Sequence, residues 1–274
     1  MRDVILSLSD GRVLAFREYG DPRGRPVVNN HGGLVCGLDI GPADTAAREL
    51  GIRLISPDRP GVGASSPKPG RRTGDWPADV AALLKHLGLQ ECGAFGWSLG
   101  SEYALALGAA GIATKVVVVG AVPPLARDQL HQLNRTDRVL ANLSMDRPNA
   151  ARRVFQLMGR NTGAIHRLTA RTSGGPDNTI VTELDGFGQW MRQALQQPSG
   201  MVEEYRAMCR PWGFSPSAVQ RPVTIWQGTA DEFVPVSLAH ELVAGLPDVD
   251  YREVTGAGHF LAYERWREVL TPLA

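Results

Sequence analysis

One short run, residues 93–101, constrains the fold of this chain more than any other part of the sequence. Its centre, residues 96–100, reads Gly-Trp-Ser-Leu-Gly and fits the pattern G-x-S-x-G. Apolar residues precede the pattern and an Ala- and Leu-rich stretch follows it, which predicts a strand, a sharp turn and a helix. Side chains two residues either side of the serine would clash in so tight a turn, which explains both glycines. The pattern therefore predicts a strained turn that exposes the Ser98 hydroxyl.

Strand and helix patterns alternate through both ends of the chain. This alternation predicts an α/β fold with a doubly wound, mostly parallel sheet, whose core comprises residues 1–122 and 217–274. The expected strands are 4–8, 13–19, 26–30, 53–57, 91–95, 115–122, 223–227 and 251–254. The expected core helices are 43–50, 76–87, 101–110, 236–246 and 260–270.

The strand patterns disappear between residues 123 and 216. This segment has amphipathic helical patterns, broken by clusters of Gly, Pro and Ser, over residues 126–143, 147–159, 178–197 and 200–209. We therefore expect a helical insertion after the sixth strand, covering residues 123–216.

A serine hydroxyl is a weak nucleophile at neutral pH and needs a base, which in turn needs a group to orient it. Asp231 follows the strand expected at 223–227, and His259 lies in a Gly-rich loop after the strand expected at 251–254. Both positions are at the carboxyl ends of strands, where ligands collect in open α/β sheets. The sequence therefore predicts Ser98, Asp231 and His259 as catalytic residues, with Glu232 as an alternative acid.

Acyl transfer also needs backbone donors for the oxyanion that develops on the substrate. We expect one donor to be the Leu99 amide, directly after the serine. The second should come from the loop after the third strand, where Gly33 is the first candidate and Leu34 the alternative. His31 in the same loop is expected to brace it, with a role as general base as the alternative.

These motifs together resemble the α/β-hydrolase fold family, in particular its branch with a helical lid. They are an HG pair at 31–32, D-x-x-G-x-G-x-S at 58–65, G-x-S-x-G at 96–100, G-x-x-D at 228–231 and G-x-G-H at 256–259. The resemblance implies a Ser98–His259–Asp231 triad, a lid over the pocket and no metal or organic cofactor. Many relatives have a proline soon after the HG pair. This chain has Gly33-Leu34 there, which leaves the second oxyanion donor open and weakens a resemblance to proline iminopeptidases.

The insertion carries large apolar side chains that can pack on the core or face a pocket. They are Phe187, Trp190, Met191, Tyr205, Met208, Trp212 and Phe214. We expect the substrate pocket to include Leu34, Trp97, Trp190 and Trp212, and its composition favours an apolar acyl or alcohol group. The sequence thus predicts a serine hydrolase for an ester, lactone or thioester of a small to medium molecule. Carbon–carbon bond hydrolysis with the same triad, and a non-hydrolytic binding or rearrangement role, are the alternatives.

Composition limits the remaining possibilities. The net charge of +1 gives no electrostatic reason to expect nucleic-acid or membrane binding. Three widely spaced cysteines predict a reducing, cytoplasmic setting, and the N-terminus lacks the apolar stretch of a signal peptide. The expected partner is a small-molecule substrate, and the oligomeric state is not predicted.

Overall fold

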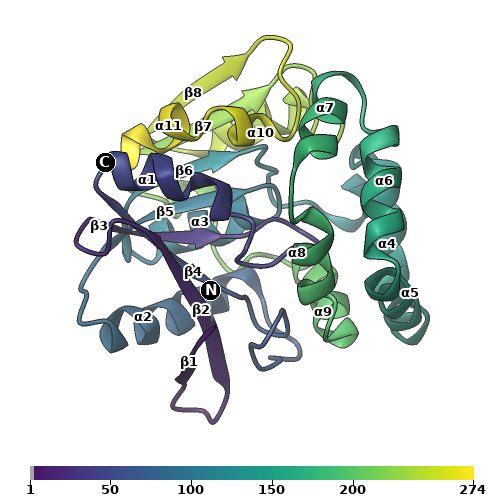
Figure 1. Ribbon diagram of the computed structural model, residues 1–274, viewed down its shortest axis with the longest axis horizontal. Helices are drawn as coiled ribbons and strands as arrows, with labels where there is room; N and C mark the ends of the chain where they lie inside the picture. The colour runs from purple at the N-terminus through teal and green to yellow at the C-terminus, as the bar shows by residue number, and fades with distance from the viewer. Residues whose placement is uncertain (1–2) are drawn as a thin grey trace.

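Eight strands form one sheet in the computed structural model, which describes residues 3–274 (Figure 1). The strands are β1 (Val4–Ser7), β2 (Val13–Gly20), β3 (Arg25–Asn30), β4 (Ile52–Pro57), β5 (Cys92–Trp97), β6 (Ala113–Val119), β7 (Val223–Gly228) and β8 (Val249–Val254). Their order across the sheet is β1-β2-β4-β3-β5-β6-β7-β8. Only the β1–β2 and β2–β4 pairs among these strands are antiparallel. The mostly parallel sheet expected from the sequence is confirmed.

The middle of the sheet is apolar because helices flank it. Residues 116–119 of β6 are four consecutive valines, and all four are buried. The core helices are α1 (Asp44–Glu49), α2 (Trp76–His86), α3 (Gly100–Ala109), α10 (Val236–Gly245) and α11 (Trp266–Leu270). Helix α11 is shorter than expected, since Leu261–Glu264 form a 3₁₀ turn and Arg265 leaves the helical conformation with φ −133°.

Six helices lie between β6 and β7 and form one group beside the sheet (Figure 1). They are α4 (Arg135–Asp146), α5 (Pro148–Arg160), α6 (Thr162–Thr172), α7 (Gly175–Glu183), α8 (Phe187–Ala194) and α9 (Pro198–Met208). We call residues 123–216 the helical insertion, and its place after the sixth strand agrees with the sequence.

Helix boundaries within the insertion differ from the expectation. The single helix expected over 178–197 is two helices, because Gly186 adopts φ +90° between α7 and α8. The helix expected over 126–143 begins only at Arg135, where the Asn134 side chain accepts a hydrogen bond from the Asp137 amide. Helix α6 was not expected from the sequence.

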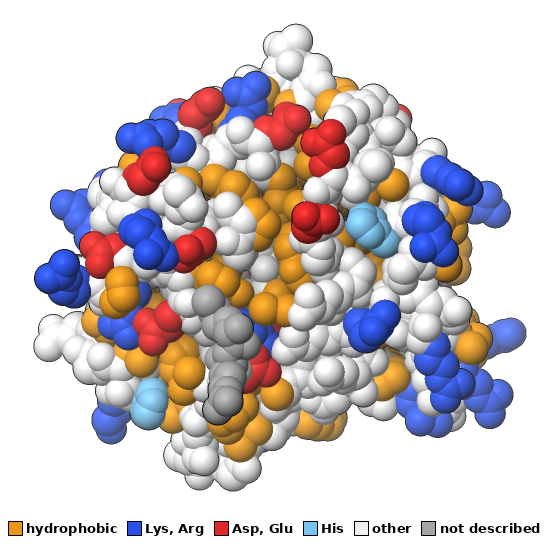
Figure 2. Space-filling view, viewed as in Figure 1, with side chains coloured by type: hydrophobic (Ala, Val, Ile, Leu, Met, Phe, Trp, Pro, Cys, Tyr) orange, Lys and Arg blue, Asp and Glu red, His pale blue; other side chains and the backbone are white. Residues whose placement is uncertain are grey.

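The two regions also differ at the surface. Acidic and basic side chains alternate over the core, whereas Lys and Arg gather over the outer helices of the insertion (Figure 2).

Within residues 3–274, no helix combines the length and apolar character that crossing a bilayer requires. Met1 and Arg2 lie outside the described residues.

Candidate active site

Ser98 occupies the turn between β5 and α3 in a backbone conformation that few residues adopt. Its φ is +54°, and its amide donates a 2.8 Å hydrogen bond to the Val119 carbonyl. A Cβ at Gly96 would lie 2.5 Å from the Gly100 carbonyl oxygen, and one at Gly100 would lie 1.9 Å from the Asn30 oxygen. Both glycines are therefore sterically required, which is the reason inferred from the pattern.

Asp231 and His259 lie in the loops that follow β7 and β8, and their side chains meet. The distance from His259 Nδ1 to Asp231 Oδ2 is 2.8 Å, with both residues buried. The amides of Phe233 and Val234 each donate a 2.8 Å hydrogen bond to Asp231 Oδ1, which fixes the carboxylate. The Phe233 ring stacks on the imidazole, with 4.9 Å between centroids.

The electrostatic environment favours a charged His259. Burial disfavours the imidazolium, but the adjacent Asp231 carboxylate outweighs that cost, and the pKa of His259 is raised above its ordinary value. Glu232, the alternative acid, is exposed, and its side chain accepts a hydrogen bond from the Gly174 amide of the insertion. Asp231 is therefore the acid that contacts His259.

A second carboxylate, which the sequence analysis missed, supports the histidine loop from the insertion. Asp177 in α7 accepts hydrogen bonds from the backbone amides of His259 (2.8 Å) and Phe260 (2.9 Å). Its side chain is buried, and that burial raises its pKa. A Cβ at position 258 would lie 2.3 Å from Asp177 Cγ, so Gly258 is needed for this approach. Asp177 carries no sequence motif that could have marked it.

The loop after β3 contributes to the same cavity as Ser98. Gly33 and Leu34 line the same cavity as Ser98 and Leu99, and Leu34 has the unusual φ of +59°. Among the described residues, the amides of Gly33, Leu34 and Leu99 donate to no protein acceptor. These amides are consequently available to a ligand, and the choice between Gly33 and Leu34 stays open.

His31 braces this loop in a neutral state. Its Nδ1 is 2.9 Å from the Gly32 carbonyl, and its Nε2 accepts the Arg59 amide at 3.2 Å. Complete burial and the nearby Arg59 charge lower its pKa well below the ordinary value. Arg59 in turn pairs with Glu204 of α9, and Arg71 pairs with the same carboxylate. The two arginines lower the pKa of Glu204 to about 2 although the side chain is buried. The loop is thereby tied to the insertion.

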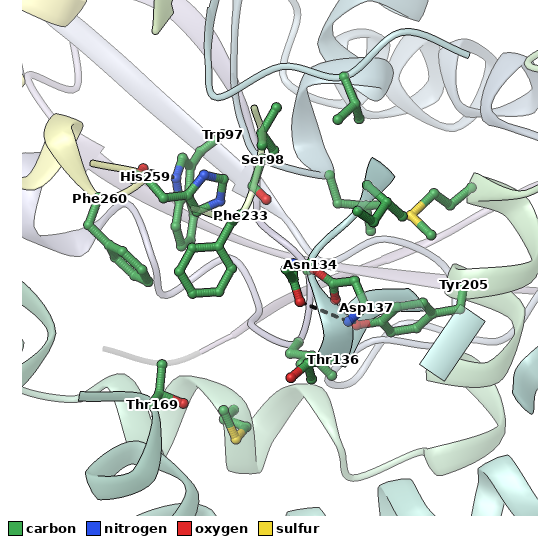
Figure 3. Close-up of a pocket in the computed structure, with 18 of the residues that line it drawn as sticks. Trp97, Ser98, Asn134, Thr136, Asp137, Thr169, Tyr205, Phe233, His259 and Phe260 are labelled. Atoms are coloured by element: carbon green, nitrogen blue, oxygen red, sulfur yellow. Dashed lines mark hydrogen bonds between the residues drawn. The ribbon is translucent and has the colours of Figure 1, made fainter. Parts of the chain in front are cut away.

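A cavity of about 180 Å³ lies between the sheet's carboxyl edge and the insertion (Figure 3). Ser98, His259, Trp97, Phe233 and Phe260 form one wall. The insertion supplies most of the opposite lining, which includes Asn134, Asp137, Met158, Ile165, Thr169, Phe187, Met191, Tyr205 and Met208. The lining is mainly apolar, with polar groups gathered around Asp137.

Two of the expected pocket residues lie elsewhere. Leu34 and Trp97 line the cavity, but Trp190 and Trp212 do not. Trp190 stacks against Tyr263, with 6.1 Å between centroids, and so packs the insertion on the core. Trp212 is 1% exposed and packs beside Phe214, with 5.3 Å between centroids. Their size suits packing as well as ligand contact, and the sequence alone could not separate the two roles.

Among residues 3–274, no three His, Cys, Asp or Glu side chains are grouped as metal ligands. Three polar residues of the lining, Asn134, Asp137 and Tyr205, form hydrogen bonds with one another.

Comparison with known proteins identifies the family and the fold. The sequence profile of the alpha/beta hydrolase family matches residues 31–271. A non-heme haloperoxidase from Rhodococcus erythropolis is 34% identical over 125 residues, which are 44% of each chain, so less than half of that relative is matched. An esterase from Thermogutta terrifontis superposes over 99% of this chain and 96% of its own, with TM-score 0.71 and 20% identity. A bromoperoxidase from Bacillus anthracis superposes over 99% of both chains, with TM-score 0.75 and 22% identity.

Proposed function

The chain belongs to the alpha/beta hydrolase family, and from that premise we propose that it is a serine hydrolase with Ser98, His259 and Asp231 as its catalytic triad. Its proposed reaction is the cleavage of an ester, lactone or thioester of a small to medium molecule through an acyl-enzyme. The observation that carries the proposal is the 2.8 Å contact between His259 Nδ1 and Asp231, on the same cavity as the strained Ser98.

The proposed first step is attack of the Ser98 hydroxyl oxygen on the substrate carbonyl carbon. His259 accepts the hydroxyl proton at Nε2, because Nδ1 is engaged with Asp231, and then returns it to the leaving group. The amides of Leu99 and of Gly33 or Leu34 stabilise the oxyanion. Water then attacks the acyl-enzyme by the same route, which releases the acid and regenerates Ser98.

The helical insertion acts in this proposal as a lid that supplies the substrate-binding wall. Support comes from its contribution to the cavity lining, which includes four methionine and phenylalanine side chains, Met158, Phe187, Met191 and Met208. Such a surface suits an apolar portion of the substrate. A cavity of about 180 Å³ suits a small to medium substrate.

The test combines covalent labelling with turnover. A fluorophosphonate probe should label Ser98 in the native protein, as peptide mass spectrometry would report, and a panel of short-chain aryl esters should be hydrolysed. Ser98→Ala should lose both labelling and roughly 10⁴-fold or more of the turnover. Ser66→Ala, which changes a serine in the loop after β4 outside the cavity, is the control. Turnover of the Ser98→Ala variant at a tenth of the native rate would overturn the serine mechanism.

A further inference from the structure

The polar side of the cavity is built around Asp137, in the first turn of α4. Tyr205 donates its hydroxyl to Asp137 Oδ1 at 2.6 Å, and the Asn134 amide group donates to Oδ2 at 2.6 Å (Figure 3). Phe155 stacks on the Tyr205 ring, with 5.6 Å between centroids, and holds it in place. The carboxylate is thus oriented by two donors from separate helical segments.

Two hydrogen bonds do not use the full acceptor capacity of a carboxylate, which offers about four lone-pair sites. Asp137 is half-buried and lines the cavity, so a ligand in the cavity can reach this carboxylate. A helix cap explains the bond between the Asp137 amide and Asn134, but it does not require the Tyr205 hydroxyl.

The charge of Asp137 has no counterion in the structure. Within residues 3–274, no Lys, Arg or His nitrogen lies within 4.0 Å of its carboxylate. Lys and Arg side chains gather over the outer helices of the insertion on the face shown in Figure 2, and neither Lys nor Arg is among the described residues that line the cavity. Besides Asp137, the ionisable side chains among the described lining residues are His259 and Tyr205. Burial and the neighbouring Asp137 carboxylate raise the pKa of the Tyr205 phenol well above its usual range.

We propose that Asn134, Asp137 and Tyr205 form a subsite that binds a protonated amine of the substrate. This inference rests on the proposed function and narrows its substrate class to esters or thioesters that carry an ammonium group on an otherwise apolar chain. The ammonium donates hydrogen bonds to the free sites of Asp137 and supplies the missing counterion. The methionines and Phe187 contact the chain between the ammonium and the scissile bond. A substrate with a carboxylate at that position is rejected by charge repulsion.

The first experiment measures binding without requiring turnover. Hexylamine, 1-hexanol and hexanoate share one apolar chain and differ in the terminal group. Calorimetry on Ser98→Ala at pH 7.5 should give hexylamine at least about tenfold tighter binding than 1-hexanol, with hexanoate the weakest, as a charge-assisted hydrogen bond implies. The same order should hold when the three compounds inhibit hydrolysis of a neutral ester by the native protein.

The second experiment removes the charge. In the Ser98→Ala background, Asp137→Asn should reduce the preference for hexylamine over 1-hexanol to about twofold or less, with 1-hexanol affinity nearly unchanged. Asp137→Ser is the second variant. It also removes the charge and keeps a polar group near the start of α4, and it covers the case in which the new amide of Asp137→Asn disturbs Asn134. Asp128→Asn, which removes an exposed carboxylate from the segment before α4, is the matched control and should keep the full preference.

Equal affinity for hexylamine and 1-hexanol would overturn the subsite, as would an amine preference that survives both Asp137 variants. Tighter binding of 1-hexanol than of hexylamine would also overturn the subsite, because Asn134, Asp137 and Tyr205 would then favour a neutral hydroxyl over an ammonium group. These outcomes concern binding to a variant that lacks the nucleophile. Failure of the triad would instead appear as retained turnover in Ser98→Ala, so the two proposals fail separately.

Discussion

The core and the helical insertion contribute to one cavity in different ways. The core supplies Ser98, Asp231 and His259 from turns at the carboxyl ends of β5, β7 and β8. The backbone there is constrained so tightly that particular glycines are required. The insertion supplies side chains from helix faces, where many apolar residues would fit. The reactive groups therefore leave a pattern in the sequence, whereas the binding wall does not.

Two buried contacts nevertheless join the regions at the site. Glu204 of α9 pairs with Arg59 and Arg71, and Arg59 donates to the carbonyls of His31 and Gly32 in the loop after β3. Asp177 of α7 holds the loop that carries His259. Removing one partner of a buried ion pair leaves an uncompensated charge, which is strongly destabilising. The insertion is thus anchored to the core through the loop after β3 and through the loop after β8.

The largest effect is expected in the core, at Asp231. Asp231→Asn should lower kcat on the order of 10⁴-fold with little change in KM, because an amide cannot stabilise the imidazolium and favours the wrong tautomer. Glu232→Gln, at the adjacent position, should reduce kcat by less than about threefold. Steady-state kinetics on one aryl ester checks both variants. A larger loss in Glu232→Gln would reverse the assignment of the acid.

Packing in the insertion should show the next largest effect, at Trp212. Trp212→Ala should lower the free energy of unfolding by roughly 3–5 kcal/mol, because the ring is buried and leaves a cavity. It should lower kcat/KM for short and long esters in equal proportion, since Trp212 does not line the cavity. Chemical denaturation and an ester series measure the two quantities. A loss of kcat/KM confined to long esters would instead indicate that Trp212 contacts the substrate.

The difference between the regions also explains what could be predicted from the sequence. The eight strands, the place of the insertion and the loops that carry Ser98, Asp231 and His259 follow from period-two patterns and local motifs. Asp177 and Asp137 could not be identified, because their importance depends on contacts between helices and loops far apart in the chain. The size of Trp190 and Trp212 suggests a place in the pocket, but both pack against other aromatic rings and neither lines the cavity.

A smaller effect is expected where the regions touch, at Asp177. Asp177→Asn keeps one acceptor for the two backbone amides and removes a negative charge near His259, so kcat/KM should fall roughly 10- to 100-fold. The pKa of His259 should fall, because Asp177, like Asp231 and Asp137, contributes to raising it. The rate requires neutral His259, so the acidic limb of the kcat/KM profile should move to lower pH. If the acidic limb of the kcat/KM profile did not move, Asp177 would have a purely structural role. Asp185→Asn, an exposed carboxylate after α7, is the control.

The smallest effect concerns ligand contact by a single side chain of α6. Ile165 lines the cavity and is half-buried, whereas Leu168 on the same helix is 59% exposed. Ile165→Ala should lower kcat/KM for a hexanoate ester about three- to tenfold while an acetate ester changes less than twofold, because only the longer acyl chain reaches this wall. Leu168→Ala removes a similar apolar side chain from solvent and should change neither ester. The ratio of the two kcat/KM values cancels any general loss of folded protein. If both esters lost activity equally, Ile165 would belong with the packing residues, and the wall that discriminates chain length would have to lie elsewhere in the insertion.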